Sequence, residues 1–548
     1  MADTLHGIGV SPGLAAGPAY RVADPPRLPP PAVVTDAEAE TARAAAALAS
    51  VAADLDRRAA STVDSTAKEI LGALAMMAAD PVLLDMVATA VRGGADGGHA
   101  LYEALGEFRR QFEAAGGYLA ERAADLDDLR DRAIAGWLGL PMPGVPTPGH
   151  PFVLVARDLA PADTAGLDPD QVLALITEAG GPTSHTAIVA RSLGLPAVVR
   201  CEGATEIADA TPVAVDGATG RVEVGVDEAT IADVRQRERL RRQQLSRSSG
   251  PGRTADGHPV ALLANIGSAA DFTGPEADGA EGVGLFRTEL LYLDRTVAPT
   301  LDEQVVAYRA VFEAAHGRRV VVRTLDAGAD KPLAFLNLDD EPNPALGVRG
   351  LRLGRRYPEV LRTQLDAIAR AARDTGADAW VMAPMVATAA EASDFVAACR
   401  AAGLPKAGVM VEIPAAALGA GTIVPLVDFL SIGTNDLSQY TFAADRQCGD
   451  LAELLDPWQP ALLQLIAACT AAARAAGKPV SVCGEAAADA GLAPVLVGLG
   501  VSSLSMSSRA IPAVRESLAA QSLADCQRLA QAALAAPDAG AARGLVLG

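Results

Sequence analysis

The chain has 548 residues, of which 50% are hydrophobic and 21% charged, and its formal net charge is −21. At about 150 residues per domain this length predicts three or four domains, and the composition is ordinary for a globular protein. The negative charge argues against general affinity for nucleic acid or anionic membranes, so an anionic substrate would need a local cluster of arginines.

Six cysteines are scattered along the chain, at positions 201, 399, 448, 469, 483 and 526. None forms a CxxC pair, which favours reduced thiols over a disulfide framework. The N-terminus lacks the basic and apolar regions of a signal peptide, and no run of about 18 apolar residues is present. We therefore expect a cytoplasmic protein without membrane insertion.

The N-terminal part of the chain begins with residues 1–24, which predict short strands separated by glycine turns, and a proline-rich connector at 25–32. From residue 36 to 138, apolar residues recur at three- and four-residue spacing. This pattern predicts a helical hairpin or bundle in which Pro81 begins a new helix. A second stretch rich in proline and glycine, at 140–151, ends the helical block.

Between residues 152 and 225 the pattern changes to short strands alternating with helices. The strand-like segments are FVLVA, QVLALITEA, PAVVR and RVEVGV. Residues 226–247 are charged and helical, and SSGPGR at 248–253 breaks the pattern. We interpret 226–253 as a linker helix that permits relative motion of the two halves.

The remainder of the chain, 254–548, contains eight short apolar runs, most of them separated by helical periodicity. The runs are 259–265, 282–286, 319–323, 379–384, 408–412, 428–432, 479–483 and 503–506. Eight strands alternating with helices over this length predict a (β/α)₈ TIM barrel, with a doubly wound open sheet as the structural alternative.

The active site of such a barrel lies at the carboxyl ends of its strands. The polar residues expected there are Arg287, Arg323, Lys331, Glu412, Asn435, Asp436, Arg446 and Cys483. Arginines bind phosphate and carboxylate bidentately, and two carboxylates from different strands suit Mg²⁺. The set predicts a site for a small phosphorylated carboxylic acid bound with Mg²⁺. Taken singly, each residue is also typical of an ordinary ion pair at a strand end.

Cys483 has two interpretations. A lone cysteine after an apolar run is typical of a small buried hydrophobe. At the rim of a barrel, it is also placed to give a proton to a bound enolate.

A second candidate site lies in the segment GGPTSHTAIVARSLGLPAVV, where paired glycines follow a strand and precede a helix. Ser184 is a good N-cap and Gly194 a good helix stop, so His185 lies in the first helical turn. The helix dipole there favours a negative phosphate on the ring and keeps the imidazole neutral, as a nucleophile requires. A glycine turn before a helix is also typical of a phosphate cradle, with a histidine that only caps the helix. The other five histidines are interpreted as surface or structural.

The ordered set of motifs resembles enzyme I of the bacterial sugar phosphotransferase system over nearly the whole chain. The motifs that carry the resemblance are GIGVSPGLAAGPA, ERAADLDDLRDR, the histidine segment, GVGLFRTELLYLDR, VVRTLDAGADK, NPALGVRGLRL, GVMVEIPAA, DFLSIGTNDLSQYTFAADR and CGEAA. A single motif is shared with other phosphoenolpyruvate-utilising enzymes, whereas the ordered set is specific.

The resemblance implies a role for each matching residue. His185 matches the histidine that is phosphorylated at Nε2, and Cys483 the proton donor that converts enolpyruvate to pyruvate. Residues matching the substrate-binding positions are Arg287, Arg323, Asn435, Asp436 and Arg446, with Lys331 and Arg349 as nearby basic positions. Glu412 and Asp436 match the Mg²⁺ ligands.

The resemblance also implies an architecture and partners. It predicts a multidomain α/β protein with a swivelling phosphohistidine domain, an inserted α-helical bundle and a C-terminal TIM barrel. The expected boundaries are 1–24 and 143–225 for the phosphohistidine domain, 25–142 for the carrier-binding insert, 226–253 for the linker and 254–548 for the barrel. The implied reaction passes the phosphoryl group of phosphoenolpyruvate to His185, releasing pyruvate, and then to the phosphocarrier protein HPr. The implied assembly is a homodimer formed through the barrel.

Two positions depart from the family pattern. The family commonly has arginine after the paired glycines, where this chain has Pro182. In the helical insert, Leu71, Leu74 and the pair Ala79-Asp80 replace a phenylalanine, a histidine and a Glu-Asp pair. The second departure alters the expected carrier-binding face.

Two other functions compete with this one. A dikinase or synthase that uses phosphoenolpyruvate shares the histidine and barrel modules but needs a nucleotide-binding domain of several hundred residues, and the insert here carries no glycine-rich phosphate loop. A non-catalytic protein that senses phosphoenolpyruvate would have a degenerate site, whereas all the catalytic positions are filled.

Overall fold

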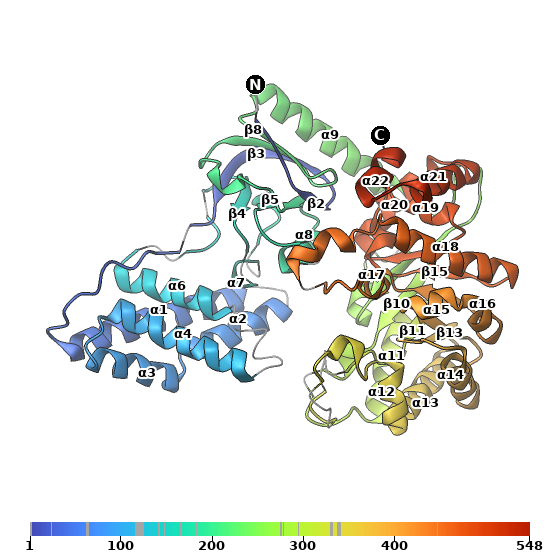
Figure 1. Ribbon diagram of the computed structural model, residues 1–548, viewed down its shortest axis with the longest axis horizontal. Helices are drawn as coiled ribbons and strands as arrows, with labels where there is room; N and C mark the ends of the chain where they lie inside the picture. Colours follow the sequence, from blue (N-terminus) through green and yellow to red (C-terminus); the bar gives the residue numbers. More distant parts are fainter. Residues whose placement is uncertain are drawn as a thin grey trace. The chain divides into compact units, whose positions relative to one another are not determined.

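The computed structural model of the chain describes residues 3–23, 25–61, 65–115, 125–140, 143–146, 148–159, 161–164, 167–181, 184–274, 277, 279–293, 295–328, 333–336, 341–446 and 448–547. The chain divides into two compact units, residues 1–241 and 242–548 (Figure 1). Each unit is described by itself.

The first unit combines one sheet with a set of helices. Its elements are β1 (Asp3–His6), β2 (Ile8–Ser11), β3 (Leu14–Arg21), α1 (Ala37–Ser61), α2 (Ser65–Ala78), α3 (Pro81–Arg92), α4 (Gly97–Ala115), α6 (Asp125–Leu138), β4 (Phe152–Ala156), α7 (Pro161–Thr164), β5 (Val172–Thr177), α8 (His185–Leu193), β6 (Ala197–Val199), β7 (Pro212–Asp216), β8 (Arg221–Val224) and α9 (Glu228–Arg247).

The eight strands of this unit form one mixed sheet in the order β1-β8-β7-β3-β4-β5-β6-β2. The central strands β3 to β6 are parallel, whereas β1, β2, β7 and β8 pair antiparallel. In β4, Phe152 and Leu154 pack in the cluster that includes residues of α8, and Val153 and Val155 pack in the cluster on the opposite face. Burial on both faces explains why this segment reads as a continuous apolar run.

The four segments predicted as strands between residues 152 and 225 are confirmed as β4, β5, β6 and β8. The sequence prediction missed β7, which begins with a proline. Pro212 is tolerated there because it is the first residue of its strand.

The helices between residues 37 and 138 form a bundle around their own apolar core, as the periodicity predicted. A helix does begin at Pro81, and the Asp80 side chain caps it by accepting a hydrogen bond from Val82 N at 2.7 Å. Leu71 and Leu74 are buried in the core of the bundle. These two substituted positions therefore do not lie on its exposed face.

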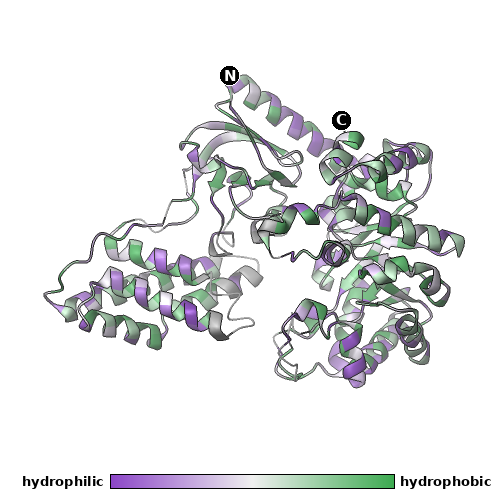
Figure 2. Cartoon of the chain, in the orientation of Figure 1, coloured by the Kyte–Doolittle hydropathy of each residue, from purple (hydrophilic) through white to green (hydrophobic). Residues whose placement is uncertain are grey.

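The predicted linker helix is observed as α9, which contains the boundary between the two units. Figure 2 shows that most of its length is hydrophilic. Only Val234 and Glu238 of this helix are buried; Val234 packs against Ala16 of β3, and Glu238 accepts a hydrogen bond from Leu14 N. The precise domain boundaries expected from the sequence stay predictions.

The second unit is a barrel with surrounding helices. Its elements are β9 (Ala261–Ile266), β10 (Gly282–Arg287), α11 (Leu301–Ala314), β11 (Arg319–Arg323), α12 (Leu351–Arg356), α13 (Pro358–Thr375), β12 (Ala379–Ala383), α14 (Ala389–Ala401), β13 (Ala407–Val411), α15 (Pro414–Leu418), α16 (Ala420–Ile423), β14 (Leu430–Ile432), α17 (Thr434–Phe442), α18 (Pro460–Ala475), β15 (Val480–Val482), α19 (Ala493–Gly498), β16 (Ser503–Met506), α20 (Ile511–Ala519), α21 (Leu523–Ala535) and α22 (Ala539–Leu547).

Strands β9 to β16 are all parallel and close on themselves, because β16 pairs with β9. The TIM-barrel prediction is confirmed, and the open doubly wound sheet is excluded. Each strand lies within two residues of the apolar run that predicted it. Reciprocal capping boxes start three of the surrounding helices, α11, α14 and α21, and fix where these helices begin.

In the described part of the chain, no single helix is both long and apolar enough to cross a membrane. One bent pair, Leu71–Ala78 with Pro81–Arg92, meets the length and composition criteria together, with a bend of 40°.

Candidate functional site

The carboxyl ends of the barrel strands bring together a network of buried charges. Arg323, the last residue of β11, lies 3.1 Å from Glu289 and 3.2 Å from Asp326. Arg349 also binds Asp326, with both carboxylate oxygens within 3.2 Å of Nη2. Its Nη1 atom lies 3.3 Å from Asp436, so two arginines and three carboxylates form one continuous network.

The electrostatics of this network keep its arginines charged. Burial alone would lower the pKa of Arg323, but the carboxylates of Glu289, Asp326 and Glu412 outweigh burial and raise it. Arg349 is 1% exposed and is held from both sides by carboxylates. The structure therefore places Arg349 as a buried bridge between Asp326 and Asp436.

Two further arginines have more exposed positions at the same rim. Arg446 is partly exposed and lies 3.6 Å from Asp436. Arg287, at the end of β10, is exposed and has no hydrogen-bond or ion-pair partner among the described residues. Desolvation by the surrounding protein and the like charge of Arg323 lower the pKa of Arg287. An anion placed beside Arg287 would relieve that repulsion.

Glu412 follows β13 directly and is 1% exposed. One carboxylate oxygen, Oε1, accepts a hydrogen bond from Met385 N at 2.6 Å, whereas Oε2 is buried and has no hydrogen-bond partner in the described chain. Burial and the negative charges of Asp436 and Asp326 raise the pKa of Glu412 well above its usual range. A divalent cation would satisfy Oε2 and offset this repulsion.

The donor set at this point fits Mg²⁺. No group of three or more histidine, cysteine, aspartate or glutamate side chains forms a complete metal shell in the described residues. Mg²⁺ needs no such shell, because it commonly takes one or two carboxylates and completes its octahedron with water and substrate oxygens.

Met385 holds Glu412 from an unusual backbone position. Its φ angle is 57°, in the left-handed region that a residue with a side chain rarely adopts. Its side chain is 1% exposed, so buried packing compensates for the backbone strain. The result is a backbone N–H aimed at the carboxylate.

Cys483 follows β15 and lies in an apolar cluster inside the barrel. Its thiol donates to the carbonyl oxygen of Ile432 at 3.5 Å, and its own carbonyl accepts a hydrogen bond from Asn265 at 3.0 Å. Burial raises the pKa of Cys483 to about 11, although a hydrogen bond with the Ser431 side chain opposes this effect. The thiol therefore keeps its proton at neutral pH.

Asn435 and Asp436 lie in the first turn of α17. Asn435 Oδ1 accepts a hydrogen bond from Glu485 N at 3.0 Å, which ties the loop after β15 to this helix. Gly484 permits the close approach, because a Cβ atom there would lie 1.9 Å from Thr434 Oγ1.

His185 is the first residue of α8, as predicted, and its side chain lies outside what the structure describes. The Ser184 hydroxyl accepts a hydrogen bond from Ala187 N at 3.3 Å, which confirms the predicted N-cap. Gly194 ends the helix with a φ angle of 68°. The positive end of the helix dipole is thus at His185.

Two positions singled out in the sequence, Lys331 and Pro182, lie outside the described residues. Conversely, the structure adds Asp326, Met385 and Asn265, which the sequence prediction did not include. Asp326 follows Arg323 by three residues in the loop after β11, so its position after a strand was an available signal. Met385 and Asn265 act through a backbone N–H and an inward-facing amide, for which the sequence carries no motif.

Comparison with known proteins gives three adjacent family matches. Residues 6–122 match the N-terminal domain of PEP-utilising enzymes, 148–220 the mobile domain, and 241–523 the PEP-binding domain. A phosphoenolpyruvate-protein phosphotransferase from Streptomyces coelicolor is 54% identical over 99% of this chain and 98% of its own length. Proteins of the same name from Haloferax volcanii and Bacillus subtilis are 42% and 39% identical, over 97% and 92% of both chains respectively.

Proposed function

The chain belongs to the family of phosphoenolpyruvate-protein phosphotransferases, enzymes that transfer a phosphoryl group from phosphoenolpyruvate to protein, and we propose that its own acceptor is His185. The observation that carries this proposal is the contrast between the paired arginines of the barrel and Arg287, which is exposed and has no ion-pair partner among the described residues. Such an arginine at a rim of buried carboxylates is suited to a substrate that brings its own negative charge.

We place phosphoenolpyruvate at the carboxyl end of the barrel. Arg287, Arg323 and Arg446 would hold its phosphate and carboxylate groups, while Asn435 orients it. The ion pairs of Arg323 fix this guanidinium before substrate arrives, so little reorganisation is needed during transfer. Mg²⁺, held by Glu412 and Asp436, would neutralise charge on the phosphoryl oxygens.

His185 would attack the phosphorus in line from the first turn of α8. The dipole of this helix stabilises the phosphate on the ring and disfavours protonation of the free imidazole. The leaving enolate would take its proton from Cys483. Burial raises the pKa of that thiol to about 11, which suits a group that arrives protonated.

The second transfer would carry the phosphoryl group from His185 to the phosphocarrier protein HPr. Such a relay requires the unit that carries His185 to leave the barrel, and we assign that motion to the segment 226–253, which includes the hydrophilic helix α9. We further propose a homodimer formed through the barrel and a cytoplasmic location. Lys331 is proposed as an additional basic group near the substrate.

The stoichiometry of pyruvate release tests this function. With excess phosphoenolpyruvate and Mg²⁺ but no acceptor protein, the wild type should release about one pyruvate per chain and then stop, because each chain has one phosphoryl acceptor. Addition of HPr should restart release. Continuous release without any acceptor protein would contradict the proposal, and so would release that requires ATP or AMP.

A further inference from the structure

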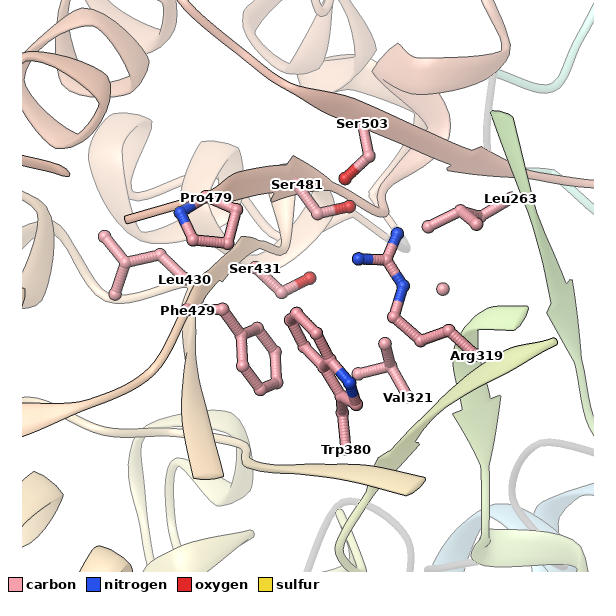
Figure 3. Close-up of a pocket in the computed structure, with 11 residues that line it drawn as sticks. Leu263, Arg319, Val321, Trp380, Phe429, Leu430, Ser431, Pro479, Ser481 and Ser503 are labelled. Carbon is pink, nitrogen blue, oxygen red and sulfur yellow. The ribbon is translucent and has the colours of Figure 1, made fainter. Parts of the chain in front are cut away.

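A small cavity lies at the end of the barrel opposite to the substrate site. Its lining includes Arg319, Pro479 and Ser503, which are at or next to the first residues of β11, β15 and β16. Figure 3 shows the hydroxyl groups of Ser431, Ser481 and Ser503 and the guanidinium of Arg319 directed toward the same space. The free volume of about 10 Å³ is room for about one water molecule.

The lining of the cavity is mostly apolar, but Arg319 and the three serines bring polar groups into the interior of a barrel, which is normally filled by apolar side chains. Ser431, Ser481 and Ser503 are paired in register on three neighbouring strands. The hydroxyl oxygens of Ser431 and Ser481 are buried, and no donor or acceptor in the described chain satisfies them by ordinary hydrogen-bond geometry, apart from the Cys483 thiol near Ser431. Unsatisfied buried hydroxyls around a space of this size are the usual setting of an ordered water.

The residues that line this cavity range from exposed and partly exposed positions to buried ones. At its outer end, Arg319 and Trp380 are partly exposed and Pro479 is exposed, whereas Ser431 at its inner end is 1% exposed. Side chains of a strand alternate between its two faces, so Cys483 and Ser481, two residues apart, face the same side of β15. The Ser431 side chain lies beside the Cys483 thiol and acts to lower its pKa, while the thiol itself donates to the carbonyl oxygen of Ile432.

A buried acid that gives up its proton in every turnover must recover one from solvent. We propose that this cavity, through Ser431 and Ser481, returns the proton to Cys483 after each reaction. The inference rests on the proposed role of Cys483 as the proton donor.

The proton steps balance as follows. The S–H bond of Cys483 breaks as a C–H bond forms on the enolate, which leaves pyruvate and a thiolate. The thiolate then takes the hydroxyl proton of Ser431, and Ser431 takes a proton from the water in the cavity, which the Ser481 hydroxyl would hold in place. The hydroxide that remains lies beside the positive charge of Arg319 and is neutralised by solvent at the mouth of the cavity.

Isotope exchange separates this route from the phosphoryl chemistry. With phosphoenolpyruvate, Mg²⁺ and carbon-labelled pyruvate in D₂O, the full-length enzyme exchanges label between the two compounds. A thiolate formed in the forward direction can recover its hydrogen from another pyruvate, so exchange of carbon does not require a solvent proton. Uptake of deuterium into the methyl group does require one. The ratio of deuterium uptake to carbon exchange therefore reports proton return alone.

We expect this ratio to fall about tenfold in Ser431→Ala, less in Ser481→Ala, and to recover in Ser431→Thr, which restores the hydroxyl. Ser502→Ala is the matched control. It lies next to Ser503, but its hydroxyl bonds the Val480 backbone and does not line the cavity, so the ratio should equal that of the wild type. A purely structural effect would slow both exchanges together and leave the ratio unchanged.

A wild-type ratio in both alanine variants would overturn the cavity route. Cys483→Ala separates that failure from failure of the proposed function. If Cys483→Ala exchanges carbon at the wild-type rate, Cys483 is not the proton donor and the inference falls with it. If Cys483→Ala loses carbon exchange while both serine variants keep the wild-type ratio, only the cavity route is wrong.

Discussion

The four arginines at the rim of the barrel differ in how much of their charge is already neutralised. Arg323 and Arg349 are buried among carboxylates, and Arg446 lies near one carboxylate. Arg287 has no such partner among the described residues. We therefore expect the buried arginines to serve both stability and catalysis, and Arg287 to serve catalysis alone.

Replacement of Arg287 and Arg323 by alanine tests this division. Arg287→Ala should change the free energy of unfolding by less than about 0.5 kcal/mol, because an exposed side chain without partners is lost. Its kcat/KM for phosphoenolpyruvate should still fall by about 10²-fold or more. Arg323→Ala should cost about 3–5 kcal/mol, because Glu289 would be left buried without its counter-ion and Asp326 would keep only Arg349. Urea denaturation measures the free energy of unfolding, and pyruvate release measures kcat/KM. Equal losses of stability in the two variants would contradict the proposal that Arg287 serves catalysis alone.

Thiol reactivity tests the protonated state of Cys483. Burial raises the pKa of this thiol to about 11, so at pH 8 only about one molecule in a thousand carries the reactive thiolate. Cys448 is exposed and should react with iodoacetamide within minutes, while Cys483 should stay unmodified in the folded enzyme. Peptide mass spectrometry after alkylation distinguishes the two, and rapid labelling of Cys483 would show that its proton is held less tightly than we propose.

At the residue scale, the sequence was sufficient to predict which site residues lie at the rim of the barrel, because they follow directly after strands. Parallel strands bring their carboxyl ends to one rim. The sequence could not predict how these residues are paired. The contact between Met385 N and Glu412, and the bridge from Asp326 through Arg349 to Asp436, join residues that are 23 to 87 positions apart. Only the folded barrel defines such contacts.

At the scale of elements, hydrophobic periodicity was sufficient for the barrel strands and for the helical bundle. The eight apolar runs are strands buried inside the barrel, where both faces exclude water. The missed strand β7 starts at a proline, which weakens its strand signal although it is longer than β6 and β8. The contacts that attach the bundle to the sheet could not be predicted from the sequence either.

That attachment includes a buried ion pair between α6 and α7. Arg132 is fully buried and lies 2.7 Å from Asp128 in its own helix and 2.6 Å from Asp163 in α7. Burial and the charge of Asp128 raise the pKa of Asp163, and Arg132 opposes this shift. Loss of Arg132 would leave two carboxylates buried near each other.

Arg132→Met should therefore destabilise the first unit by about 3–5 kcal/mol at neutral pH. The pKa of Asp163 in the folded variant would lie further above its unfolded value of 3.8, so the folded state would bind more protons than the unfolded state. The variant should regain stability relative to the wild type as the pH falls toward 4. Arg57→Met is the control, because it removes only the more exposed ion pair between Arg57 and Asp54 on α1. It should change the free energy of unfolding by less than about 1 kcal/mol. A defect that does not depend on pH would contradict the buried-charge explanation.

At the scale of the whole molecule, the chain carries a net charge of −21 and yet gathers arginines at one end of a barrel. That cluster lies in the second unit, whereas His185 lies in the first. The proposed reaction therefore depends on two units meeting and separating during each cycle. Leu71 and Leu74, which depart from the family pattern, are buried. They therefore contribute to the core of the bundle and not to an exposed carrier-binding surface.

The most direct test of this account is the position of the phosphoryl group. After incubation with phosphoenolpyruvate labelled in its phosphate and with Mg²⁺, the wild type should carry an acid-labile, base-stable label on the peptide that contains His185. His150→Ala is the control, because His150 is exposed and makes only long contacts, at 3.4 Å to Tyr20 and 3.3 Å to the Pro151 carbonyl, and it should label like the wild type. We predict that His185→Ala takes up no label, and label that persists in this variant would contradict the account.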